Sequence, residues 1–128
     1  MIEINKDQFK KLLKNPNDKP VVMLNLLKFI KDGGREAYAR YLKEASVFIE
    51  RVGGKLLLFS RPNELINGTE TWDLLMLVQY PSRKSFIEMT ANSDYLKIHA
   101  FREEALERAV LYATDEITVR DLLQENPE

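Results

Sequence analysis

The sequence predicts an α+β fold with a split βαβ topology, in which helices cover one face of a four-stranded antiparallel sheet. The first observation is the order of the elements: after a leading helix come strand, helix, strand, strand, helix and strand. The second is that segments 21–29 and 71–80 are apolar on both faces, as central strands are when both faces are covered. The third is Pro62, which places the strand before it at a sheet edge.

The first 20 residues predict a short surface helix followed by a loop. Asn5 and Gln8 have the spacing of a capping box, which satisfies free backbone groups in the first turn of a helix. The apolar stripe that follows is narrow, so we expect a surface helix over 4–14. Asparagine and proline dominate residues 15–20, as is typical of a loop.

The first main strand and the longest helix follow. Residues 21–29 form the strand, and Gly33-Gly34 interrupts it. Residues 35–52 carry aromatic and aliphatic side chains at helical spacing. Gly53-Gly54 ends this helix, because glycine accepts the left-handed conformation found at helix C-termini.

The next two strands form a hairpin. The second strand covers 55–61, and Asn67-Gly68 is a strong hairpin signal that joins it to the third strand over 71–80. Strand alternation places Trp72 on the same face as Tyr80.

The C-terminal third predicts an interrupted helix, a strand and a tail. Ser82 caps a helix that breaks near 91–93 and resumes from 94 to about 108. The last strand covers 110–113 or extends as far as Val119. We expect a single domain over 1–128, with 1–19 as a helical extension and 121–128 as a frayed tail.

The composition excludes several classes of protein. The net charge of −1 offers no basic surface to nucleic acid, and the absence of cysteine excludes thiolate sites and disulfides. No apolar run approaches the ~20 residues of a membrane span, and the N-terminus is too polar for a signal peptide. We therefore expect a cytoplasmic protein that binds neither nucleic acid nor membrane.

The central strands also predict a partner. In a split βαβ fold both main helices lie on one face of the sheet, which leaves the other face bare in a monomer. Because segments 21–29 and 71–80 are apolar on that face too, a second copy of the chain is its simplest cover. We expect a homodimer.

Several short motifs occur in a characteristic order along the chain: the run 25–29, Tyr38, Tyr41, Gly53-Gly54, Trp72, Tyr80-Pro81-Ser82, Phe86, Tyr95, Arg102, Ala105 and Leu106. In these motifs residues 20–115 resemble domain-of-unknown-function family thirteen-thirty, in the dimeric α/β-barrel superfamily. The resemblance implies a ferredoxin-like fold and a homodimer whose sheets pack into a barrel, and it implies no particular activity. Relatives in the superfamily include monooxygenases, lactone isomerases, haem-binding and haem-degrading proteins and stress-induced proteins, which hold small apolar or aromatic ligands between sheet and helices.

Two residues are candidates for catalysis. His99, the single histidine, lies on the inner stripe of the last helix, either as a locally bonded structural residue or as a general base or haem ligand in a pocket. Asn25 lies in a central apolar strand, where its amide must bond either a neighbouring backbone group or a ligand.

Three residues are candidates for substrate binding. Arg102, one turn from His99, pairs either with an acid of its own chain or with a carboxylate substrate. Tyr41 and Trp72 offer aromatic surface with a polar end. The sequence does not decide whether the chain is an enzyme.

The function predicted is therefore broad. It is a homodimer with a pocket for a small apolar or aromatic ligand, comparable to cofactor-independent monooxygenases or isomerases. The alternatives are a non-catalytic binding or stress-response dimer and a haem-binding or haem-degrading protein. No cofactor or metal is expected, since no flavin, nicotinamide or phosphate-loop signature occurs.

Overall fold

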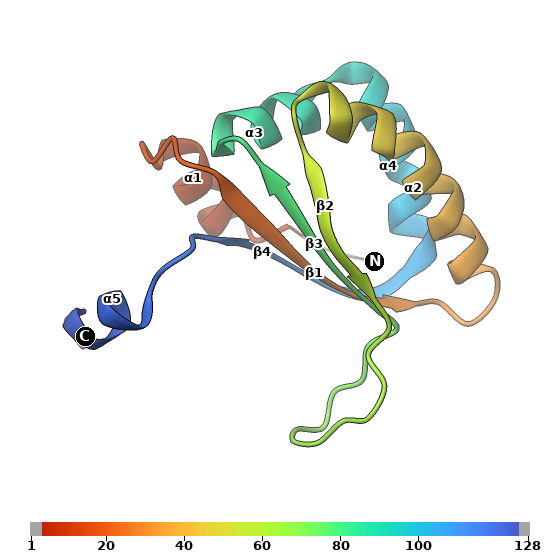
Figure 1. Ribbon diagram of the computed structural model, residues 1–128. Helices are drawn as coiled ribbons and strands as arrows, with labels where there is room; N and C mark the ends of the chain where they lie inside the picture. Colours follow the sequence, from red (N-terminus) through yellow and green to blue (C-terminus); the bar gives the residue numbers. More distant parts are fainter. Residues whose placement is uncertain (1–3, 126–128) are drawn as a thin grey trace.

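The computed structural model of the chain describes residues 4–125. Four strands form one antiparallel sheet in the order β2-β3-β1-β4, so the predicted α+β ferredoxin-like fold is confirmed (Figure 1). The elements are α1 (Lys6–Lys14), β1 (Val21–Phe29), α2 (Gly34–Arg51), β2 (Lys55–Ser60), β3 (Leu74–Tyr80), α3 (Arg83–Ala91), α4 (Ser93–Ala105), β4 (Leu106–Thr114) and α5 (Val119–Gln124).

The two central strands alternate as the sequence predicts. On β3 every second residue from Leu74 to Tyr80 is buried, and β1 shows the same pattern from Val21 to Leu27. In the register of the pair, Asn25 lies opposite Met76. The buried set faces α2, α3 and α4, which gather over one side of the sheet (Figure 1).

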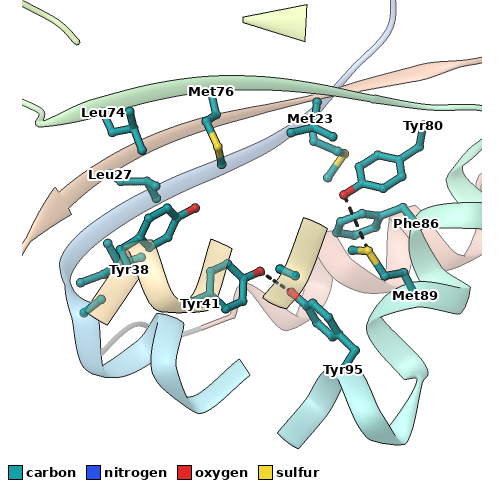
Figure 2. Packing of buried hydrophobic residues seen from close by; sticks show 14 of the residues in the cluster. Met23, Leu27, Tyr38, Tyr41, Leu74, Met76, Tyr80, Phe86, Met89 and Tyr95 are labelled. Carbon is teal, nitrogen blue, oxygen red and sulfur yellow. Dashed lines mark hydrogen bonds between the residues drawn. The ribbon is translucent and has the colours of Figure 1, made fainter. Parts of the chain in front are cut away.

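The core between sheet and helices is rich in tyrosine and methionine (Figure 2). Side chains of both central strands meet aromatic rings from the helices there. The Tyr80 ring stands edge-on to Phe86, with centroids 5.2 Å apart, and its hydroxyl donates to the Met89 sulfur over 3.9 Å. Burial of these large side chains supplies the main stabilisation of the fold.

The opposite face of the sheet is not covered by a helix of the described chain (Figure 1). Its aliphatic residues, such as Leu24 and Leu77, are only half-buried. At the edge, the four residues Leu56–Phe59 of β2 are all exposed, and the pairing with β3 shifts between Leu56 and Leu58. An apolar sheet face and an apolar edge strand therefore remain open to a partner.

The boundary between α4 and β4 differs from the prediction. The helix ends at Ala105 and the strand begins at Leu106, whereas the sequence predicted helix to about 108 and strand from 110. Residues 106–109 continue the helical apolar spacing, but they pair with β1, where Leu106 lies opposite Phe29. Sheet pairing overrides the local helical preference.

Both ends of the chain also correct the sequence prediction. Asn5 occupies the N-cap of α1 but makes no side-chain capping hydrogen bond, so the predicted capping box with Gln8 is wrong. Asn5 and Gln8 are exposed, so water can satisfy the first turn. The frayed tail is wrong for 121–124, which lie in α5, while 1–3 of the extension and 126–128 of the tail lie outside the described residues.

Candidate functional site

Three tyrosines from two helices form the polar centre of the core. Tyr38 and Tyr41 extend from α2, and their ring centroids lie 5.4 Å apart. Tyr95 extends from the first turn of α4, and its hydroxyl lies 2.6 Å from that of Tyr41 (Figure 2). We call Tyr38, Tyr41 and Tyr95 the tyrosine cluster.

Local sequence sets where Tyr95 lies. The Asn92 side chain accepts hydrogen bonds from the backbone N–H groups of Asp94 and Tyr95, at 2.8 and 3.2 Å, and so starts α4. Tyr95, His99 and Arg102 then follow at intervals of four and three residues, which places them on one face of the helix. The structure therefore brings together three predicted site residues, Tyr41, His99 and Arg102.

Arg102 is buried without a complete set of partners. Only 9% of the residue is exposed, and its Nη2 is buried with no hydrogen-bond partner. Among the described residues no carboxylate forms an ion pair with it. Burying a guanidinium without a full set of hydrogen bonds costs free energy of folding. The unbonded N–H group can donate a hydrogen bond to an anion.

Burial and neighbouring charge control the protonation of the cluster. Burial raises the pKa of Tyr38 from 10.0 to about 12, against the opposing effect of nearby Arg102. Burial also raises the pKa of Tyr41 and of Tyr95, and Arg102 again opposes this. All three phenols are therefore protonated at neutral pH and can donate hydrogen bonds.

His99 is held in its neutral form. Burial lowers its pKa below 6.5, the positive charge of Arg102 lowers it further, and Glu103 acts in the opposite direction. The His99 Nδ1 lies 3.5 Å from a Glu103 carboxylate oxygen, and its ring centroid lies 5.9 Å from that of Tyr95. A neutral imidazole can accept a proton, and here the charge of Arg102 opposes that uptake.

Asn25 lies on the helix-facing side of β1, between Met76 of β3 and Leu111 of β4. It is 7% exposed, and its Nδ2 donates to the Met23 carbonyl oxygen over 3.4 Å, a long bond. The amide thus shares the inner face of the sheet with the core side chains.

Trp72 belongs to a different part of the molecule. It precedes β3, so the strand predicted from residue 71 begins later, at Leu74. The Arg108 guanidinium lies 4.5 Å from the centroid of the Trp72 ring. Trp72 therefore packs against β4 and is not part of the tyrosine cluster.

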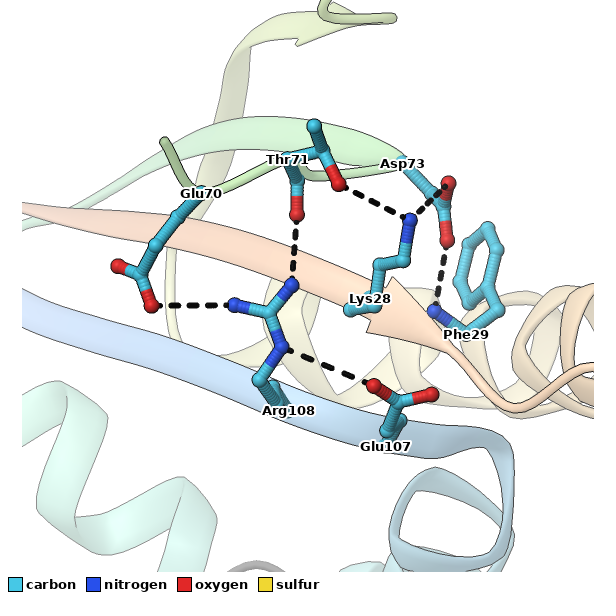
Figure 3. A network of polar contacts seen from close by, with 7 residues as sticks. All are labelled: Lys28, Phe29, Glu70, Thr71, Asp73, Glu107 and Arg108. Atoms are coloured by element: carbon cyan, nitrogen blue, oxygen red, sulfur yellow. Dashed lines mark hydrogen bonds and ion pairs between the residues drawn. The ribbon is translucent and has the colours of Figure 1, made fainter. Parts of the chain in front are cut away.

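A polar network that the sequence did not predict surrounds this end of the sheet (Figure 3). Asp73 accepts a hydrogen bond from the Phe29 N–H at 2.9 Å and lies 3.5 Å from the Lys28 Nζ. Arg108 donates to the Thr71 carbonyl at 2.8 Å and to Glu70 at 3.3 Å. The sequence feature that could have predicted this network is Asp73, an acid directly before an apolar strand, where its carboxylate can accept a hydrogen bond from the neighbouring backbone.

A cleft of about 440 Å³ opens beside this network. Phe29 is one of its lining residues, and the Phe29 ring packs against Tyr38, with centroids 5.6 Å apart. Phe29 thus lies next to both the cleft and the tyrosine cluster. The cleft is lined by Lys28, Phe29, Ile30, Lys31, Arg35, Glu36, Asp73 and Glu107.

Residues 4–125 lack the side-chain groups of a metal site and the helices of a membrane span. Within that range no group of three or more histidine or acidic side chains could hold a metal ion. None of the helices in the same range is both long and apolar enough to span a bilayer.

Two of the solved structures with a similar fold, from Rhodopseudomonas palustris and Bacteroides fragilis, are described as proteins of unknown function. The RPA0582 protein of Rhodopseudomonas palustris is 27% identical, with a TM-score of 0.84 over 91% of this chain and 96% of that one. The At3g17210 protein of Arabidopsis thaliana gives a TM-score of 0.62 at 12% identity, over 77% and 97% of the two chains. A dimeric protein of ferredoxin-like fold from Bacteroides fragilis gives 0.51 at 13% identity, over 76% and 96%.

The sequence comparisons agree with the resemblance seen in the motifs. A search of curated proteins finds no significant match. The model of one family, described as Domain of unknown function (DUF1330), matches residues 29–115, which is more than half of the chain. The chain therefore belongs to the DUF1330 family.

Proposed function

We propose that the chain is a homodimer that binds a small aromatic or apolar carboxylate between its sheet and helices. The observation that carries this proposal is Arg102, a buried guanidinium with an unpartnered Nη2. A carboxylate would satisfy it with a charge-assisted hydrogen bond, which is stronger than a neutral one.

The surroundings of Arg102 favour an aromatic acid. The tyrosine cluster offers apolar rings for the body of the ligand and protonated hydroxyls for its carboxylate. The cleft would supply the route inward, because Phe29 lines it and the Phe29 ring packs against Tyr38 of the cluster. Rotation of Phe29 would join the cleft to the cluster.

His99 gives the proposed site a means of chemistry. Its pKa is lowered by burial and by Arg102, so it is a neutral base on the same helix face as the anion site. Proton abstraction from a bound acid, as in an isomerase, needs no cofactor. In a cofactor-independent monooxygenation the substrate would supply the electrons and dioxygen would accept them, with Asn25 as a hydrogen-bond donor to the bound ligand.

A non-catalytic binding dimer is the second candidate, because side chains occupy the space between sheet and helices. Tyr38, Tyr41, Tyr80, Phe86 and Met89 are all buried there (Figure 2). In that case Arg102 and the cluster would bind an acid without turning it over.

The dimer itself rests on two observations. The apolar sheet face opposite the helices is uncovered in the single chain (Figure 1). The Bacteroides fragilis protein of similar fold is dimeric. Sedimentation of the purified protein at tens of micromolar tests this part, and a monomer at that concentration would contradict it.

Calorimetric titration with benzoate tests the binding site. We expect wild-type protein to bind benzoate, and Arg102→Met to weaken binding by tenfold or more, because one charge-assisted hydrogen bond contributes about 1.5–3 kcal/mol. Benzamide, which has the same shape without the charge, should bind weakly to both.

Arg40→Met is the matched control. Arg40 also extends from a helix and lies over an aromatic ring, 5.8 Å from the Phe101 centroid, but it is exposed. Its variant should bind benzoate as the wild type does. Equal affinity of the Arg102→Met and Arg40→Met proteins for benzoate would rule out Arg102 as the anion site.

A further inference from the structure

The segment that follows β4 is held against α3 by an ion pair. Asp115 follows the last residue of β4, and its two carboxylate oxygens accept hydrogen bonds from the two terminal nitrogens of Arg83, each at 2.9 Å. Arg83 is buried, at 6% exposed. This two-point ion pair anchors the start of the C-terminal segment to α3.

The segment after this anchor is built as a helix. We call residues 116–125 the C-terminal arm. The Thr118 hydroxyl accepts from the Asp121 N–H at 3.0 Å, and the Asp121 carboxylate accepts from the Thr118 N–H at 2.9 Å. This reciprocal capping box starts α5, so the local sequence specifies its helix.

Within residues 4–125 the arm packs on no other element. All residues from 115 to 125 are exposed, and α5 stands away from both the sheet and the other helices (Figure 1). Its large apolar side chains are among the most exposed of the described residues: Val119 is 74% exposed, Leu122 60% and Leu123 78%. A six-residue helix is not stable alone in water, so α5 requires a surface to pack on.

The edge strand β2 offers an exposed surface that matches the arm in hydrophobicity and is opposite to it in charge. Leu56–Phe59 on the edge strand β2 are exposed and apolar, between the basic residues Lys55 and Arg61. The arm is acidic by contrast, with three carboxylates and one guanidinium: Glu116, Asp121, Glu125 and Arg120. Apolar side chains thus match apolar side chains, and the charges around them are opposite in sign.

The arm also continues the bare sheet face. Tyr112 of β4 is 63% exposed and lies opposite Leu24, which belongs to the uncovered side of β1. The strand then leads directly through Asp115 into the arm. A second copy covering the bare face would therefore come within reach of the arm.

We propose that the C-terminal arm packs on the β2 edge of a second copy of this chain, and that the partner returns its own arm in the same way. The inference rests on the homodimer proposed above. A reciprocal exchange fits because each copy carries one arm and one uncovered edge, in equal number.

Engineered cysteines test the contact directly, since the chain has none of its own. Leu122→Cys in one chain and Leu57→Cys in another should form a disulfide-linked pair under mild oxidation of the mixture. Leu13→Cys, on α1 and 51% exposed, is the control, and it should not link to Leu57→Cys.

Sedimentation of a double variant, Leu122→Asp with Leu123→Asp, provides the second measurement. Both side chains are exposed in the single chain, so the fold should persist while the dimer dissociation constant rises by about tenfold or more. Leu13→Asp should leave that constant unchanged.

Two results would contradict the proposed arm exchange, and only one of them would also contradict the homodimer. A wild-type dimer whose dissociation constant is unchanged in the double variant, with no link between positions 57 and 122, removes the arm exchange alone. A wild-type monomer removes both the arm exchange and the proposed homodimer.

Discussion

The hydroxyls of Tyr41 and Tyr95 lie 2.6 Å apart inside the protein and tie α2 to α4. Neither side chain faces water, and burial raises the pKa of both phenols. The hydrogen bond therefore persists at pH values around neutrality, and it links two of the helices that cover the sheet.

Removing either hydroxyl should destabilise the fold. Tyr41→Phe and Tyr95→Phe should each lower the free energy of unfolding by about 1–2 kcal/mol, because the remaining hydroxyl is left buried without its partner. The double variant should cost less than the sum of the two. Urea denaturation measures all three.

Tyr112→Phe is the control for this pair, since Tyr112 is 63% exposed and should tolerate the change. Strict additivity of the Tyr41→Phe and Tyr95→Phe effects would show that the two hydroxyls do not interact in solution.

The single histidine gives a direct reading of the charge on Arg102. Burial and Arg102 lower the pKa of His99, and Glu103 opposes them. Arg102→Met should therefore raise the pKa of His99, and Glu103→Gln should lower it further. Proton NMR titration of the one imidazole follows both shifts, and equal pKa values in the two variants would contradict this electrostatic picture.

The same pKa shift predicts how stability depends on pH. The unfolded chain has the higher histidine pKa, near 6.5, so it binds the proton more readily than the folded protein does. The contribution of His99 to the free energy of unfolding is fully present above pH 6.5. It is lost as the pH falls from there through the pKa of His99 in the folded protein. The loss should be smaller in Arg102→Met, as thermal unfolding across this pH range would show.

The sequence predicts this structure best where one pattern dominates. Alternating burial on β3 follows directly from its residues, and the Ser82 cap of α3 is confirmed, since its hydroxyl accepts from the Ser85 N–H at 3.2 Å. Helical spacing also placed His99 near Arg102. The end of α4 was missed because residues 106–109 suit either structure, and pairing with β1 decides between them.

The contact between Trp72 and Arg108 could not be predicted from the sequence, for a related reason. Trp72 meets Arg108 only because β3 and β4 flank the same central strand, β1. A contact across three strands depends on register, and register depends on the whole sheet.

Gly34 marks a close approach between two elements. A methyl group there would lie 2.7 Å from the Ala105 carbonyl oxygen and 3.0 Å from the Phe29 Cβ, and neither can move easily. Gly34→Ala should therefore lower the free energy of unfolding by about 2–3 kcal/mol, measured by urea denaturation.

Gly33→Ala separates crowding from backbone strain. A methyl group at Gly33 meets nothing within 4 Å, but its φ of +78° disfavours alanine. The expected cost is about 1 kcal/mol. If Gly34→Ala proved no more costly than Gly33→Ala, the close contact with Ala105 would not hold in solution.

The stacking of Arg108 on Trp72 can be followed by fluorescence, because the chain has one tryptophan. Arg108→Ala removes the guanidinium and its bond to the Thr71 carbonyl, and so exposes the indole to water. The emission should shift to longer wavelength, with a loss of about 1 kcal/mol in stability. Arg40→Ala, which removes an arginine from over Phe101 instead, should leave the emission unchanged. A red shift of equal size in both variants would mean that Arg108 does not shield Trp72.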